Sequence, residues 1–282
     1  MNKLYILIFL ILISFNVKAN EFNFNNFQDD ALFVEFYSIP SPDEVLSYIH
    51  NNEIKYTPKI LAPNNNIQKF RTTTDKLLAL GVFLADMAYA ISFENTTTAL
   101  NYYETVEALG KNLNIITTEI EDLGARIIKN LGVADSISDL YDEIYLSLMG
   151  NLHDTGRFGE YAIISASGFV ESLHLAINSD KDQQNVEEFN KRVWEQKMIL
   201  DQLEAMFERY LSANMKKNIQ DDIAELSNSL NEYISHKTTT SSSTIITGAV
   251  LIGVEKPKEY DEFPPIDEIV KNIDTLRKKW IK

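Results

Sequence analysis

Apolar residues recur every three or four positions over most of the chain, from about residue 72 to residue 236. This spacing places them on one face of an α-helix, and the alternation of a half-buried strand is missing. Proline is also absent over 72–236. We predict helices at about 74–94, 97–130, 135–150, 158–178, 182–213 and 215–236, with the second broken near Gly110 or Asn114. Long helices joined by short turns are typical of an antiparallel helical bundle, so we predict an all-α fold of that kind over 72–236.

The chain before this bundle has a different pattern. Residues 20–71 begin with alternating polar and aromatic residues, which predicts an extended segment, and they include one short helix. Ser41 is a candidate N-cap for that helix, Pro42 follows at its first position, and Glu44 completes a capping box.

The chain after the bundle changes character again. Residues 237–265 form a linker that opens with serine and threonine and contains an apolar, β-branched run at 245–254. This run predicts a strand or an extended stretch, because β-branched residues are enriched in strands. We favour its packing on the bundle over its use as an exposed edge for a partner. Residues 266–282 predict a final amphipathic helix with its acids early and its bases late.

Two short sequences inside the bundle resemble each other. GVFLADMAYAI covers residues 81–91 and GFVESLHLAI covers residues 168–177, and they align if one residue is skipped. A polar turn and a long amphipathic helix follow each of them. A duplicated helical hairpin would account for this similarity, since repeats bury their apolar faces on each other. Chance similarity between helices of one pattern is the alternative.

The first nineteen residues have the pattern of a secretory signal peptide. Lys3 supplies the positive charge, residues 4–15 are almost wholly apolar, and Val17 and Ala19 match the small residues before a cleavage site. The apolar run is shorter than the roughly 20 residues that span a bilayer. We therefore favour cleavage after Ala19 over an uncleaved anchor. The prediction is a bacterial periplasmic or secreted protein, soluble after cleavage and without a further membrane span.

Composition limits the functions open to such a chain. The 282 residues carry 26 Lys and Arg against 41 Asp and Glu, a net charge of −15. That balance argues against nucleic acid, whose recognition needs clustered Lys and Arg. Cysteine is absent, so disulfides and thiol chemistry are excluded. The motifs of phosphate-binding loops, serine hydrolases and zinc proteases are missing, and we expect no cofactor.

A single acid interrupts the most apolar helix. Asp86 lies within LGVFLADMAYAISFE, residues 80–94, and its neighbours one turn away, Tyr89 among them, are apolar or aromatic. Burying an unpaired carboxylate costs on the order of several kcal/mol, so Asp86 must pair, hold a proton or reach the surface. It is either a ligand-binding acid in the core or a carboxylate bonded to a Tyr, Ser or Lys of a neighbouring helix. We favour the second interpretation.

Glu171 and His174 form the sequence E-x-x-H on another apolar helix. Di-iron carboxylate bundles use this spacing to turn both side chains toward one site, together with a second E-x-x-H and two further glutamates. The bundle contains no second copy, so Glu171 and His174 are a weak metal candidate and we predict no metal. With Asp86 and Tyr89 they are candidates for a ligand-binding pocket between helices.

These observations favour a non-enzymatic protein. We predict an exported helical binding or scaffold module of the bacterial cell envelope, whose partner is an unknown protein or a small molecule. The alternative is a bundle that binds a small molecule or a metal near Glu171 and His174.

Overall fold

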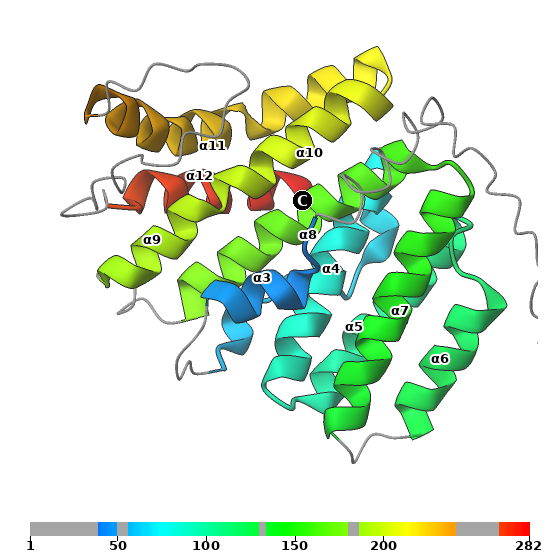
Figure 1. Ribbon diagram of the computed structural model, residues 1–282. Coiled ribbons are helices and arrows are strands. Elements are labelled where there is room, and N and C mark those ends of the chain that lie inside the picture. Colours follow the sequence, from blue (N-terminus) through cyan, green and yellow to red (C-terminus); the bar gives the residue numbers. More distant parts are fainter. Residues whose placement is uncertain (1–38, 50–55, 130–133, 180–185, 241–264) are drawn as a thin grey trace, which may run out of the picture. The chain divides into compact units, whose positions relative to one another are not determined.

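The computed structural model describes residues 39–49, 56–129, 134–179, 186–240 and 265–282 (Figure 1). The described residues are helical and contain no strand, which confirms the predicted all-α class for this part of the chain. The helices are α3 (Pro42–Ile49), α4 (Thr73–Ser92), α5 (Thr96–Asn112), α6 (Thr118–Lys129), α7 (Ala134–Asp154), α8 (Phe158–Ser179), α9 (Glu187–Glu195), α10 (Lys197–Tyr210), α11 (Ala213–Thr240) and α12 (Asp267–Trp280). The predicted signal peptide and the apolar run at 245–254 lie outside the described residues.

Local sequence signals set several of the helix ends. At the start of α3 the Ser41 backbone N–H donates to Glu44 Oε2 (2.7 Å), as predicted for a capping box. At the start of α4 the Thr72 hydroxyl accepts from the Asp75 N–H, and the Asp75 carboxylate accepts from the Thr72 N–H. The predicted break in the second helix separates α5 from α6, where Asn114 takes a positive φ of 55°.

One predicted helix is divided. The pattern over 182–213 predicts a continuous helix, whereas the structure has α9 and α10 on either side of Gln196. There the Gln196 N–H donates to the carbonyl of Val193 (3.2 Å), a bond over three residues that tightens the last turn of α9. No glycine or proline marks this position in the sequence, so the apolar stripe alone gave no sign of the division.

The helices α4 and α8 form the centre of the fold (Figure 1). Residues 77–90 of α4 and 161–177 of α8 are buried without interruption. A helix that is apolar on every side needs cover on every side, and α3, α5, α7, α10 and α12 pack around the pair. In the described part of the chain, no helix is both long enough and apolar enough to cross a membrane.

Glycines let the two central helices approach closely. A Cβ atom added to Gly81 would lie 2.2 Å from the carbonyl oxygen of Ile164 and 2.9 Å from the nitrogen of Gly168. The backbones of α4 and α8 are therefore in contact at this crossing. Gly81 and Gly168 are also the first residues of the two similar sequences noted above.

The central helices run in the same direction. Gly81 meets Gly168 at the crossing. Further along both helices, Asp86 lies close enough to Glu171 for the charge of the glutamate to raise the pKa of Asp86. Contacts thus advance toward the C-terminal ends of both helices together. The central pair is therefore parallel.

The glycine crossing generates the first prediction. Gly81→Ala should lower the free energy of unfolding by about 3 kcal/mol or more, because the new methyl group overlaps backbone that cannot move aside. Gly150→Ala in α7 is the matched control, since a Cβ there meets nothing within 4 Å. It should stabilise the protein by about 0.5–1 kcal/mol through helix propensity alone. Urea unfolding measures both, and equal effects would contradict the close crossing.

Candidate functional site

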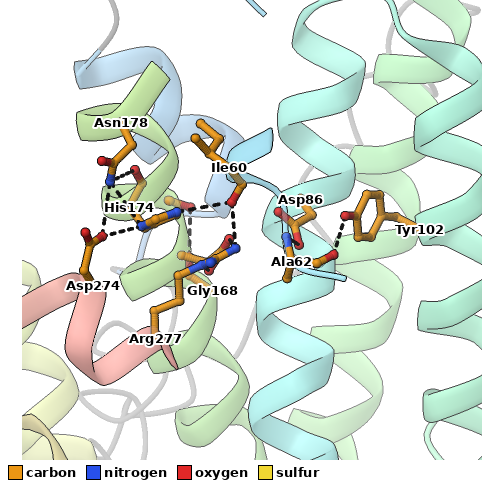
Figure 2. Close-up of polar contacts among 11 residues, drawn as sticks. Ile60, Ala62, Asp86, Tyr102, Gly168, His174, Asn178, Asp274 and Arg277 are labelled. Carbon is orange, nitrogen blue, oxygen red and sulfur yellow. Dashed lines mark hydrogen bonds and ion pairs between the residues drawn. The ribbon is translucent and has the colours of Figure 1, made fainter. Parts of the chain in front are cut away.

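The predicted site residues converge on one short stretch of backbone, residues 57–62. Asp86 and Tyr89 come from α4, and Glu171 and His174 come from α8. Figure 2 shows Asp86 and His174 near Ile60 and Ala62, with two side chains of α12 beside them. We call Asp86, Glu171, His174, Asp274 and Arg277, with the peptide groups of Ile60 and Ala62, the buried polar cluster.

An ion pair between α8 and α12 lies at the centre of this cluster. Arg277 donates from Nε to Glu171 Oε2 (2.6 Å) and from Nη2 to Glu171 Oε1 (2.8 Å). Glu171 has no exposed surface and Arg277 is 8% exposed. Paired hydrogen bonds of this kind are among the strongest contacts available to a carboxylate. Arg277 Nη2 also donates to the carbonyl of Ile60 (2.8 Å), which attaches residues 57–62 to the same pair.

Asp86 lies beside this pair without a cation of its own. Its Oδ2 accepts from the Ala62 N–H (3.2 Å), while Oδ1 finds no donor in the structure. Burial above all, and then the negative charge of Glu171, raise the pKa of Asp86 well above its ordinary value, against the opposing charge of Arg277. One guanidinium cannot neutralise two buried carboxylates. Burial and the charge of Glu171 therefore favour the protonated, neutral form of Asp86.

His174 forms the second polar contact with α12. Its Nδ1 lies 2.7 Å from Asp274 Oδ1, and its Nε2 lies 3.2 Å from the carbonyl oxygen of Ile60. Both neighbours are acceptors, so both bonds form together only when both ring nitrogens carry a proton. Burial raises the pKa of Asp274, but the hydrogen bond and charge of His174 outweigh it, and the pKa is lowered. The bond from Asn178 Nδ2 to Asp274 Oδ1 (3.2 Å) acts in the same direction.

Two tyrosines also form hydrogen bonds with the backbone of residues 57–62. The Tyr89 hydroxyl accepts from the Thr57 N–H (3.0 Å), and the Tyr102 hydroxyl of α5 donates to the carbonyl of Ala62 (2.6 Å). The Thr57 hydroxyl donates to the carbonyl of Ser179 at the end of α8 (3.2 Å). Backbone that would otherwise be buried unpaired is thus satisfied by side chains from α4, α5, α8 and α12.

The structure adds partners that sequence reasoning missed. We expected Asp86 to bond to a Tyr, Ser or Lys of a neighbouring helix, whereas the bond that the structure shows comes from the backbone N–H of Ala62. The sequence analysis did not name Arg277 or Asp274 as site residues. Arg277 did carry a signal, because it lies one turn after Ile273 on the apolar face of α12, where a charged residue needs a partner.

The geometry suits a structural clamp more than a reaction centre. The oxygens of Glu171 are held by Arg277, and the nitrogens of His174 face Asp274 and Ile60. Among the described residues, no group of three or more His, Asp or Glu side chains could hold a metal ion. Comparisons with family models, with curated proteins and with solved structures found no match for the chain. The cluster is therefore interpreted from its own contacts.

Removing the buried guanidinium of Arg277 should destabilise the fold. Arg277→Met should lower the free energy of unfolding by about 3–5 kcal/mol, because Glu171 is left buried without a counter-charge. Lys271→Met, on the exposed side of α12, should change it by no more than about 0.5 kcal/mol. In the double variant Glu171→Leu/Arg277→Met, part of the loss should return, since an apolar pair can replace a buried ion pair. A loss for Arg277→Met no larger than that for Lys271→Met would refute the clamp.

The protonation of Asp86 gives a pH dependence of known sign. The unfolded chain releases this proton near the ordinary pKa of 3.8, while the folded protein retains it to higher pH. Stability is thus lost as pH rises from about 4 toward the raised pKa, by up to about 1.4 kcal/mol per pH unit. Asp86→Asn, neutral at every pH, should escape this loss and become more stable than wild type toward neutral pH.

Asp274→Asn provides the matched comparison, because the pKa of Asp274 is lowered in the folded protein. Its carboxylate contributes stability above the unfolded pKa, and this contribution disappears as pH falls through the folded pKa. The variant should therefore be less stable than wild type at neutral pH. Urea unfolding between about pH 4 and about pH 7 separates the two cases. Parallel pH profiles for Asp86→Asn and wild type would show that Asp86 is ionised.

Proposed function

We propose that this chain is an exported, non-enzymatic helical protein that acts as a binding or scaffold module in the bacterial cell envelope. The observation that carries the proposal is that the chemically capable side chains of the core hold the fold together. Glu171 bonds to Arg277 of α12. His174 bonds to Asp274 of α12 and to the carbonyl of Ile60, and Asp86 bonds to the N–H of Ala62. Groups engaged in this way are not presented to a substrate, which favours recognition by the outer surface over catalysis in the core.

The export part of the proposal is supported by the first nineteen residues. Their positive start, short apolar run and small residues before position 20 have the pattern of a signal peptide that is cleaved after Ala19. Export places the protein in the periplasm or outside the cell. The strong negative charge of the chain then disfavours nucleic acid and leaves a protein or a small molecule as the partner.

We propose further that the fold derives from a duplicated helical hairpin, within a bundle whose other neighbours are antiparallel. The aligned residues Gly81 and Gly168 lie together at the crossing of α4 and α8. A short turn joins α4 to α5, and Gly159 at the start of α8 contacts Tyr210 at the end of α10. Two hairpins related by a two-fold axis would give a parallel central pair of this kind.

The alternative is a small molecule or metal bound near Glu171 and His174. Such a ligand would have to displace Arg277 from Glu171, or Asp274 and Ile60 from His174. The cluster would lose its own hydrogen bonds in exchange, and so the geometry favours the surface-binding proposal.

Native mass spectrometry of the protein, purified gently from its exported compartment, tests the proposal. The expected result is residues 20–282 alone or with another polypeptide attached. Deletion of 241–258, which lies between α11 and α12 in the sequence, then separates two docking sites. Retention of the polypeptide indicates docking on a helix face, and its release with an unchanged thermal midpoint indicates docking on the 245–254 run. A stoichiometric metal or organic mass that disappears in both Glu171→Gln and His174→Gln would overturn the proposal in favour of the alternative.

A further inference from the structure

A pocket of about 590 Å³ opens between the first turn of α4, the first turns of α11 and the end of α12. It shares no residue with the buried polar cluster. Its size lies within the roughly 300–1,000 Å³ of small-molecule sites. Three buried apolar side chains contribute to its wall, one from each helix: Leu78, Ile219 and Trp280. The pocket therefore offers apolar surface to the body of a ligand.

The charges around this pocket are mainly negative. Asp75, Asp221 and Asp222 line it, against one lysine, Lys279. The lysine is already neutralised, because Lys279 Nζ forms an ion pair with Asp222 Oδ1. The other oxygen of Asp222 accepts from Trp280 Nε1 (2.8 Å). Two carboxylates, Asp75 and Asp221, thus remain in the lining without a cation among the described residues.

An anion is disfavoured at this place. The N-terminus of a helix attracts anions through its free N–H groups, but at α4 the Thr72 N–H and Asp75 N–H are already bonded within the capping box. The Asp75 carboxylate itself occupies the favourable position beside the helix dipole. A second anion would meet this carboxylate and that of Asp221, which is exposed at the pocket.

We propose that this pocket binds a small organic cation, a protonated amine carried on an apolar body. The ammonium group lies toward Asp221 and Asp75, and the apolar body lies on Leu78, Ile219 and Trp280. The site is additional to the protein-binding role proposed above and does not depend on it, since the pocket is built from α4 with its N-cap, α11 and α12.

Three probes of the same shape and different charge test the proposal by NMR titration of the purified protein. Benzylamine should bind more tightly than benzyl alcohol, and benzoate should bind most weakly. Asp221→Asn should weaken benzylamine binding about two- to five-fold and leave benzyl alcohol unchanged, as expected for one exposed ion pair. Glu104→Gln, which removes an exposed charge from α5, is the control and should weaken neither probe.

A blocking variant locates the binding. Asn218 is exposed and lines the pocket, so Asn218→Trp should fill it and abolish binding of both benzylamine and benzyl alcohol without unfolding the protein. Binding that survives in Asn218→Trp overturns the proposal. Equal affinities for the three probes, or equal effects of Asp221→Asn and Glu104→Gln, overturn it as well.

Discussion

The ion pair between Glu171 and Arg277 is the interaction on which the buried polar cluster depends. A carboxylate without exposed surface is tolerated inside α8 because a guanidinium from α12 reaches both of its oxygens. The same guanidinium bonds to the carbonyl of Ile60, so the charge that α8 requires also fixes residues 57–62. Asp86 lies beside this pair, and its raised pKa favours the neutral form that the core tolerates. Helix α12 is thus held by charge as well as by its apolar face.

The helices were readable from the sequence because their causes are local. The three-to-four spacing of apolar residues predicts α4 and α8 within a few residues, and the capping residue Ser41 marks where α3 begins. The division at Gln196 escaped prediction, since it rests on one tightened turn that no glycine or proline announces. The direction of α4 relative to α8 escaped as well. It depends on tertiary packing, and the spacing of apolar residues carries no information about which helices become neighbours.

Only some residues of the candidate site could be predicted from the sequence. Asp86 and Glu171 stand out because an acid within an apolar run needs an explanation wherever it is placed. Their partners do not stand out, because Arg277 lies 106 residues from Glu171 and 217 residues from Ile60 along the chain. Backbone acceptors such as the Ile60 carbonyl leave no trace in the sequence at all. Polar residues in apolar helices therefore identify one side of a buried contact, and the structure is needed for the other.

The long separation between Glu171 and Arg277 along the chain also bears on how the protein folds. During synthesis, α4 and α8 emerge well before the cation that their carboxylates require. Until α12 is available, packing α8 against α4 would bury a carboxylate without its counter-charge. Early packing of α8 against α4 is therefore unfavourable. Docking of α12 must also close a long loop, whose entropy cost comes before its contacts form. The buried carboxylate of α8 thus makes the packing of the central pair depend on a helix made much later in the chain.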